Sequence, residues 1–223
     1  MNTFDPLNVV SFDLETTSVN PAEARIVTSA LVTISGRDVN AHEMLANPGI
    51  EIPEAATKIH GITTEHAREH GRPHEEVLSQ TISALNDAWA SGRTVIVFNA
   101  AYDLSVLRQL EPDFVVSGPV FDPFVIDKIY DTYRSGKRTL TDLCQVYNVR
   151  IDNAHEATSD ALAAARIAWR QAKQFPNIAT MDLGELMETQ TVGYYKSQLS
   201  LKKYLEGQGK NASTVNLSWP MHG

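Results

Sequence analysis

Cysteine is almost absent from this sequence: Cys144 is the one thiol among 223 residues. A single thiol excludes an internal disulfide and a four-cysteine zinc site, so we expect it to be buried and inert. No apolar run reaches the ~18 residues that a membrane-spanning helix needs. Residues 1–6 lack the basic and apolar regions of a secretory signal. These absences predict a cytoplasmic protein that makes no membrane contact.

The sequence also contains fewer basic than acidic residues. The chain has 19 Lys and Arg against 27 Asp and Glu, which gives a formal net charge of −8. This balance argues against a protein that coats nucleic acid through a broad basic surface. It does not argue against an enzyme that binds only the end of one strand. In such an enzyme, part of the negative charge would belong to metal-binding carboxylates, which bound cations neutralise.

What the chain does contain is typical of a folded α/β protein. Hydrophobic residues make up 43% of it, and its length suits one sizeable domain with an appended segment. Residues 7–15, 25–34 and 39–45 read as strands, the last two joined as a hairpin through Gly36. The apolar run at residues 94–98 predicts a buried central strand, and residues 120–121 a short fifth one.

The helices are expected between and after these strands. An apolar stripe over residues 74–90 predicts one that packs on a sheet. Further helices are expected over these segments: residues 102–110, 123–133 and 139–147, and an alanine-rich stretch ending before Pro176. A hairpin meander followed by helix and buried strand predicts a mixed five-stranded sheet flanked by helices.

Pro176 and Asn177 mark the expected domain boundary. It leaves an α/β domain over residues 1–176 and a helical extension with an irregular tail over residues 177–223. The extension carries Lys196, Lys202 and Lys203 among tyrosines, which would suit contact with a nucleic-acid strand. A packing helix with a solvated lysine face explains them as well.

Acidic side chains stand out in three segments. In the first strand, period-two alternation puts Asp13 and Glu15 on one face, where they repel each other unless they share a cation. A solvated strand end would also account for the pair. Asp103 lies early in a helix and Asp160 in the first turns of another, five positions after His155. Either aspartate alone is a common helix-start residue.

Together these residues indicate hydrolysis of phosphodiesters. Two divalent cations ~4 Å apart can stabilise the attacking and leaving oxygens of such a reaction. Carboxylates supply the hard oxygen ligands that Mg²⁺ prefers, and a histidine with an unperturbed pKa near ~6.5 can take the proton from the attacking water. The predicted catalytic residues are Asp13, Glu15, Asp103, His155 and Asp160.

The same segments carry a family resemblance. The sequences DLETT from Asp13, NAAYD from Asn99 and HEATSDA from His155 resemble, in order, the three motifs of the DEDDh (DnaQ-like) 3′-5′ exonucleases of the ribonuclease H-like superfamily. The segment IHGIT at residues 59–63 also agrees, and the likeness spans residues 7–175. The resemblance implies a ribonuclease H-like fold, an exonuclease domain over residues 1–176 and release of nucleoside monophosphates from a 3′ end.

The resemblance also implies roles for single residues. Asp13, Glu15 and Asp160 would hold one divalent cation, Mg²⁺ or Mn²⁺, and Asp13 and Asp103 a second, with His155 as general base. The implied substrate-binding residues are Leu14, Thr16, Thr17, His60, Asn99 and Tyr102. His60 is expected in a loop, where a lone histidine is more often merely polar surface. Two positions depart from the family pattern, which often has glycine where Ser18 stands and phenylalanine where Tyr102 stands.

Several functions remain open at this point. Single-stranded DNA is the favoured substrate, in proofreading or repair, with RNA trimming as the alternative. A polymerase-associated module that binds nucleic acid without catalysis would be expected to lack a ligand, and none is missing. A partner polymerase or sliding clamp is also considered. Residues 198–201 resemble a clamp-binding peptide, but Lys202 stands where such peptides end in an aromatic, and helical periodicity explains their leucines equally well.

Overall fold

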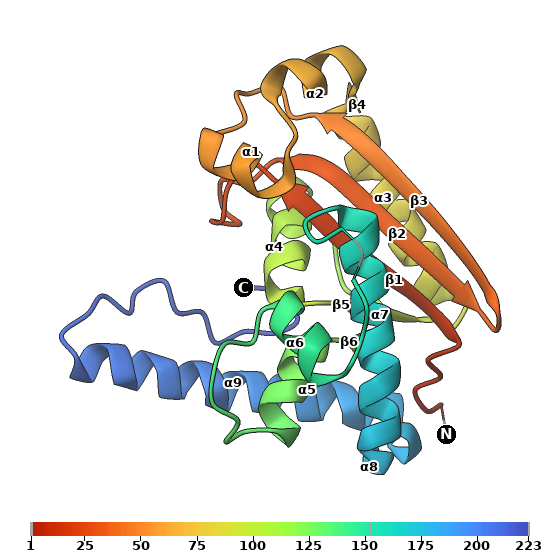
Figure 1. Cartoon of the computed structure of the whole chain (residues 1–223), viewed down its shortest axis with the longest axis vertical. Coiled ribbons are helices and arrows are strands. Elements are labelled where there is room, and N and C mark those ends of the chain that lie inside the picture. Colours follow the sequence, from red (N-terminus) through yellow and green to blue (C-terminus); the bar gives the residue numbers. More distant parts are fainter. Residues whose placement is uncertain (1, 152, 223) are drawn as a thin grey trace.

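A computed structural model describes residues 2–151 and 153–222. Its centre is a mixed sheet with strand order β4-β3-β2-β1-β5-β6 (Figure 1). The strands are β1 (Asn8–Thr16), β2 (Ile26–Ser35), β3 (Asp38–Asn47), β4 (Arg72–Pro73), β5 (Thr94–Val97) and β6 (Val120–Phe121). The predicted α/β class with a mixed sheet is confirmed. The sheet has six strands rather than five, because the two-residue β4 pairs beside β3.

The pairing of the strands decides where their ends lie. β1, β2 and β3 are antiparallel neighbours, and the hairpin turn between β2 and β3 uses Gly36 at a φ of +63°. β5 runs parallel to β1, and β6 parallel to β5. Because parallel strands end at the same edge of a sheet, the segments that follow β1 and β5 lie near each other.

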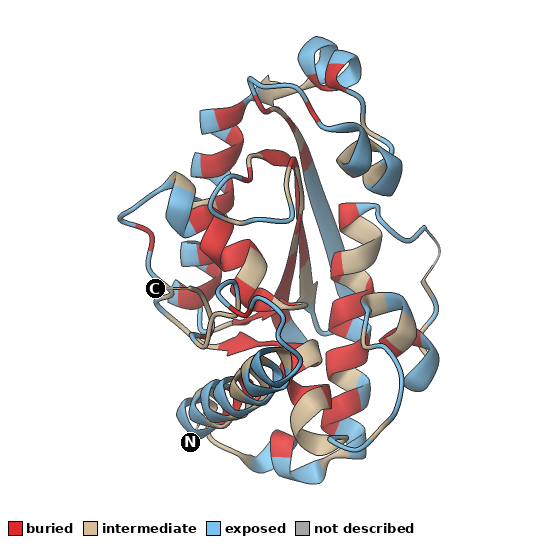
Figure 2. Ribbon diagram, turned by 90° about the vertical axis from the view of Figure 1, so that its left-hand side faces the viewer, coloured by how far each residue is buried: buried red, intermediate tan, exposed pale blue. Residues whose placement is uncertain are grey.

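The two faces of β1 pack against different helices. Val10, Phe12 and Leu14 belong to a hydrophobic cluster with residues of α3 (His74–Ala90) and α4 (Ala100–Leu110). Val9, on the other face, packs in a cluster with residues of α7 (Ala157–Gln174). Figure 2 shows the buried residues concentrated between the sheet and the helices on both sides. Helix α3 begins and ends at residues 74 and 90, as the apolar stripe in the sequence predicts.

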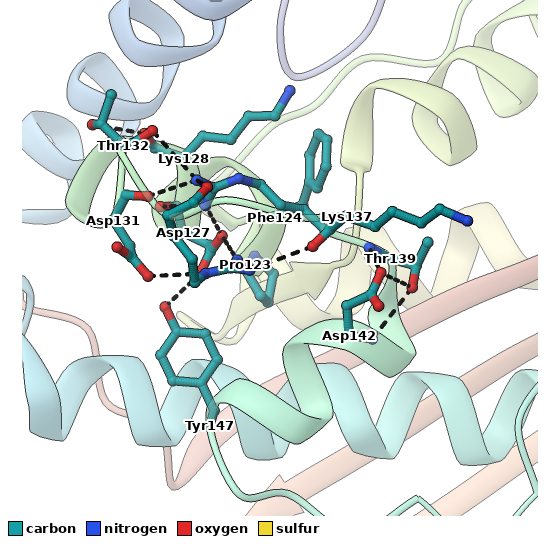
Figure 3. A network of polar contacts seen from close by, with 12 residues as sticks. Pro123, Phe124, Asp127, Lys128, Asp131, Thr132, Lys137, Thr139, Asp142 and Tyr147 are labelled. Atoms are coloured by element: carbon teal, nitrogen blue, oxygen red, sulfur yellow. Dashed lines mark hydrogen bonds and ion pairs between the residues drawn. The ribbon is translucent and has the colours of Figure 1, made fainter.

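Two short helices, α5 (Pro123–Tyr130) and α6 (Leu140–Val146), precede α7. The connection between them is fixed on Asp127, whose buried carboxylate forms ion pairs with Arg134 and Arg138 (Figure 3). The Tyr147 hydroxyl donates to the same carboxylate at 2.8 Å. A buried charge is stable only when it is paired and hydrogen-bonded in this way, so the loop over residues 131–139 is firmly anchored.

Two more short helices, α1 (Glu54–His60) and α2 (Thr64–His70), lie beyond the upper end of the sheet in Figure 1. Thr63 caps α2 by accepting from the His66 N–H. The sequence does not predict α1 or the five-residue α8 (Pro176–Thr180), because each is too short to show a helical period.

The C-terminal segment returns to the core. Helix α9 (Leu183–Gly207) packs on α5, and Gly193 lets the two approach, since a Cβ there would lie 2.4 Å from atoms of the Ile129 side chain. Tyr194 and Trp219 join the cluster that α3 and α4 form with β1. Residues on both sides of position 176 thus share hydrophobic clusters, and the division there stays a prediction. Across the described residues, none of the helices has the length and apolarity needed to cross a membrane.

Candidate active site

The first pair of acids lies on the face of β1 that is turned toward α7. Ser11, two residues before Asp13 and on the same face, donates from its hydroxyl to the Ala161 carbonyl at 2.6 Å. Because side chains alternate along a strand, Asp13 and Glu15 continue that face toward the first turn of α7. Both side chains are half-buried. The expectation that they share a face is confirmed by this packing.

Asp103 contacts the same strand from α4, which packs on the other face of β1 from α7. Strand β5 pairs with β1 only as far as Phe12 and Val97, so the Leu14 N–H beyond it has no strand partner. The Asp103 carboxylate accepts that N–H at 3.1 Å and is almost fully buried. Asn99 turns the chain from β5 into α4 with a left-handed backbone at φ +60°, a conformation that asparagine tolerates better than most residues.

The third acid comes from α7. Asp160 lies in the first turn of this helix, and its carboxylate accepts the His155 N–H at 3.3 Å. His155 has a left-handed backbone at φ +71°, which turns its N–H back toward the helix. Glu15, His155 and Asp160 each offer one ligand atom, and these atoms all lie within 4.8 Å of one another.

One hollow in the surface is lined by all five predicted catalytic residues, Asp13, Glu15, Asp103, His155 and Asp160. The structure therefore brings together acids that are far apart in the sequence. The other lining residues include Phe98, Phe124 and three residues of the anchored loop that ends at Thr139.

The acids of this hollow disfavour each other's ionised forms. Burial raises the pKa of Asp13 well above its usual range, and the charges of Asp103, Asp160 and Glu15 add to the effect. Burial and then the charge of Asp160 raise the pKa of Glu15 to about 8. Burial also raises the pKa of Asp103, opposed by the N–H of Leu14. A bound cation would relieve this repulsion.

The donor set fits a hard divalent cation. Four carboxylates from β1, α4 and α7 face one hollow, and no thiol lines it. Oxygen-rich sites of this kind suit Mg²⁺, Mn²⁺ or Ca²⁺, whereas zinc and copper favour nitrogen and sulfur ligands. These residues form an acidic cluster that can hold a divalent cation.

Glu43 is an acid at this site that sequence analysis missed. Strand register places Glu43 of β3 opposite Ala30, and Ala30 opposite Asp13, so the three lie in one row on the same face. The Glu43 carboxylate accepts the Thr158 N–H at 3.1 Å and also the Thr158 hydroxyl. It thereby caps the start of α7 and adds its charge to those that raise the pKa of Asp13.

A second hollow adjoins the first. It is lined by all six predicted substrate-binding residues, Leu14, Thr16, Thr17, His60, Asn99 and Tyr102. Leu14, Glu15, Asn99 and Tyr102 also line the carboxylate hollow, so the two are continuous. His60 is the last residue of α1 rather than a loop residue. Its Nδ1 accepts the Ile62 N–H at 3.1 Å, and burial lowers its pKa.

The segments that carry these residues match a known protein family. The model of a family described as RNase_T exonuclease matches residues 10–168. The chain belongs to this exonuclease family. The matched range contains every predicted site residue and stops within α7, so α8, α9 and the tail lie outside it.

Curated relatives of this exonuclease are much longer proteins. A DNA polymerase III subunit epsilon-like protein of Rhodobacter capsulatus is 31% identical over 135 residues, covering 56% of this chain and 17% of the relative. A PolC-type DNA polymerase III of Caldanaerobacter subterraneus is 25% identical over 181 residues, covering 79% and 12%. The chain thus spans less than a fifth of the length of these relatives.

Solved structures of exonucleases share the fold. Exonuclease X in complex with 5′ overhanging duplex DNA superposes with a TM-score of 0.62 and 16% identity, covering 82% of this chain and 99% of that one. Exonuclease I of E. coli in complex with a dA16 oligonucleotide gives a TM-score of 0.64 and 18% identity, covering 77% and 42%. The ribonuclease H-like fold that the motifs imply is confirmed.

Proposed function

We propose that this protein is a divalent-metal-dependent 3′-5′ exonuclease that releases nucleoside monophosphates, with single-stranded DNA as its preferred substrate. The observation that carries the proposal is the single hollow lined by Asp13, Glu15, Asp103, Asp160 and His155. Repulsion between these four carboxylates destabilises the fold, so packing alone does not explain why they gather in one hollow. They are explained by a cationic ligand and an anionic substrate.

The carboxylates have distinct tasks in this proposal. Asp13, Glu15 and Asp160 would hold one cation, and Asp13 and Asp103 a second one. When bound, the cations would stabilise the charge on the scissile phosphate and lower the pKa of the attacking water. Asp103 also fixes the backbone of Leu14 through its hydrogen bond, and Glu43 holds the start of α7, where Asp160 lies.

His155 would accept the proton of the attacking water. Its side chain is exposed at the rim of the hollow, where it can exchange that proton with solvent. Its backbone N–H is held by Asp160, which sets the position of the ring relative to the carboxylates. A positioned base of this kind contributes ~10²–10⁴-fold to a rate.

The adjoining hollow would receive the terminal nucleoside. Thr16 and Thr17 follow the strand that carries the acids, and His60 lies across from them on α1. Because burial lowers the pKa of His60, its ring is neutral at physiological pH and can pack against a base or sugar. Because the two hollows are continuous at Asn99 and Tyr102, a terminal sugar would lie beside a phosphate at the carboxylates.

The relatives suggest a setting for this activity. Those described above are named as subunits or types of DNA polymerase III, which supports proofreading or repair in association with a polymerase. Residues 198–201, which resemble a clamp-binding peptide, lie inside α9, so clamp binding stays a prediction that a pull-down would test. Location in the cytoplasm likewise stays a prediction.

The test is digestion of DNA and RNA oligomers labelled at the 3′ or the 5′ end, with Mg²⁺ or Mn²⁺ and with a chelator as control. We expect the 3′ label to be released first as a mononucleotide, faster from single-stranded DNA, and only with metal. Faster digestion of RNA would favour the exoribonuclease alternative. Release of the 5′ label first, or cleavage in chelator, would contradict the proposal.

A further inference from the structure

The outer face of α7 carries a group of cations away from the carboxylates. Arg166, Arg170 and Lys173 are exposed there, around the half-buried Trp169. Arg166, Trp169 and Arg170, together with residues 148–150, which precede the helix, line a hollow in the surface. We call the group formed by Arg166, Trp169, Arg170 and Lys173 the basic face of α7.

None of these three cations has an acidic partner among the described residues. Arg166 donates to the Arg150 carbonyl at 3.0 Å. The Arg170 guanidinium lies 5.2 Å, and the Lys173 Nζ 3.7 Å, from the centre of the Trp169 ring. The ion pairs formed by described residues all lie elsewhere. Cation–π contact holds the side chains together without neutralising them.

This group of cations stands out against the acidic balance of the whole chain. With a net charge of −8, the protein would be expected to scatter its cations among acids. Neighbouring cations without counter-charge repel one another, and an anionic ligand would remove that repulsion. Arginine in particular presents a planar fork of donors that matches phosphate oxygens.

The basic face also begins close to the candidate active site. Asp160 lies on the same helix, and at a rise of 1.5 Å per residue Arg166 is ~9 Å and Lys173 ~20 Å further along its axis. At 3.6 residues per turn, Arg166 and Arg170 are turned about 120° and about 80° from Asp160 around the helix axis, so an anionic chain that ends at the carboxylates reaches them by passing around α7 as well as along it. A nucleic-acid strand is such a chain, with one phosphate in every unit.

We propose that the basic face of α7 binds the phosphate backbone of the substrate strand upstream of its 3′ end. This inference rests on the proposed exonuclease function and extends it with a second contact for longer strands. The cations would hold the strand between successive cleavages, while the carboxylate hollow acts on its terminus. Strands too short to reach Arg166 would gain nothing from the contact.

The first experiment measures binding, which needs no catalysis. Fluorescence anisotropy of a labelled long oligothymidylate is recorded in chelator at several salt concentrations, with the unmodified protein and with an Arg166→Ala/Arg170→Ala variant. Loss of two phosphate contacts flattens the slope of log affinity against log salt by about 1.4, because each contact contributes ~0.7 for a single strand. Affinity near 0.1 M salt should fall by at least about tenfold.

Two control variants separate charge from structure. Arg37 and Lys210 are also exposed, and Arg37→Ala/Lys210→Ala removes the same net charge without touching α7. We expect this variant to keep the salt slope, and Arg166→Lys/Arg170→Lys to retain most of it. An unchanged slope in the alanine pair on α7, or an equal loss in the control pair, would overturn the proposal.

The second experiment separates this inference from the proposed function. Turnover of a dinucleotide and of a long oligothymidylate is compared at low substrate concentration. The Arg166→Ala/Arg170→Ala variant should digest the dinucleotide at the original rate and lose about tenfold in kcat/KM on the long strand, the fold-change expected in binding. Equal losses on both substrates would mean that the two arginines contribute to folding rather than to strand binding, which would contradict the inference. Absence of all digestion by the unmodified protein, with salt-dependent binding intact, would reject only the exonuclease function.

Discussion

The hydroxyl of Tyr102 donates a hydrogen bond to the backbone carbonyl of Ser18, 84 residues earlier in the chain. The same hydroxyl contacts the side-chain oxygen of Thr16, which in turn donates to the Ser18 carbonyl at 3.1 Å. Ser18 and Tyr102 are the two positions that depart from the family pattern. The contact means that a phenol from α4 stabilises the turn that follows β1.

Replacement of Tyr102 by phenylalanine should loosen this turn. The ring would remain, but the Ser18 carbonyl would lose one of its two donors. We expect the free energy of unfolding to fall by ~1 kcal/mol and KM for a 3′ end to rise a fewfold, with kcat little changed. Steady-state kinetics and denaturant unfolding check this. A lower kcat at unchanged KM would instead place the hydroxyl in the chemical step.

Removal of a carboxylate from the hollow should end catalysis without unfolding the protein. In Asp13→Ala and Asp160→Ala, digestion with Mg²⁺ or Mn²⁺ should be abolished, because each variant lacks a ligand of the proposed cation site. Stability without metal should be kept or increased, since burial raises the pKa of both groups, and the charges of Asp103 and Asp160 raise that of Asp13 further. Circular dichroism and thermal unfolding provide the control. Full activity in either variant would refute the assignment.

His155→Ala should separate the base from the metal site. The rate should fall by ~10²–10⁴-fold, as for loss of a general base, because the side chain that accepts the proton is gone. Metal affinity should be retained, since the carboxylates remain. Isothermal calorimetry with Mn²⁺ measures that affinity. Its collapse would mean that His155 binds metal, as its closeness to Glu15 and Asp160 also allows.

The metal-free protein should lose stability as pH rises. The pKa of Glu15 is raised from 4.5 to about 8 in the folded state, so the folded protein keeps a proton that the unfolded chain releases. The free energy of unfolding therefore decreases from about pH 4.5 to about pH 8. Denaturant unfolding in chelator at several pH values measures this, and Glu15→Gln should show a weaker dependence. An identical dependence in that variant would exclude Glu15 as a contributor.

Trp219→Phe should weaken the support of α4. The Trp219 Nε1–H donates at 3.2 Å to the buried Asp122 carboxylate, which also accepts the N–H groups of Asn99 and Ala100. Loss of a hydrogen bond to a charged group costs ~1.5–3 kcal/mol, and loosening of the Asn99 turn should reduce kcat well below the unfolding temperature. Tyr133→Phe, at a side chain that is 99% exposed, is the control and should stay within ~0.5 kcal/mol. Unfolding curves and initial rates distinguish the two.

Local patterns in the sequence predicted much of this protein. The run before Phe98 and the stripe over residues 74–90 identify β5 and α3, because burial on one or both faces leaves a period that is visible in the chain itself. The spacing of His155 and Asp160 likewise indicates a loop that enters a helix. Each of these inferences depends only on neighbours within a few turns.

The carboxylate cluster needed more than local pattern. The motifs identify the acids, but their spacing in the sequence does not show that Asp13, Asp103 and Asp160 line one hollow. That follows from β1 and β5 being parallel and from α7 packing on the face of Ser11. Glu43 could not be predicted from the sequence, because it lies in an exposed strand and belongs to no recognisable motif. Only the strand register through Ala30 places it in one row with Asp13.

The sequence by itself determined which segments become strands and helices and which residue types can do the chemistry, because hydrophobic period and side-chain chemistry are properties of the chain. Only the tertiary structure decided that Tyr102 supports Ser18 and that Trp219 of the tail supports the start of α4. These contacts depend on strand register and on the docking of helices. Both are settled by packing between segments that are distant in the chain.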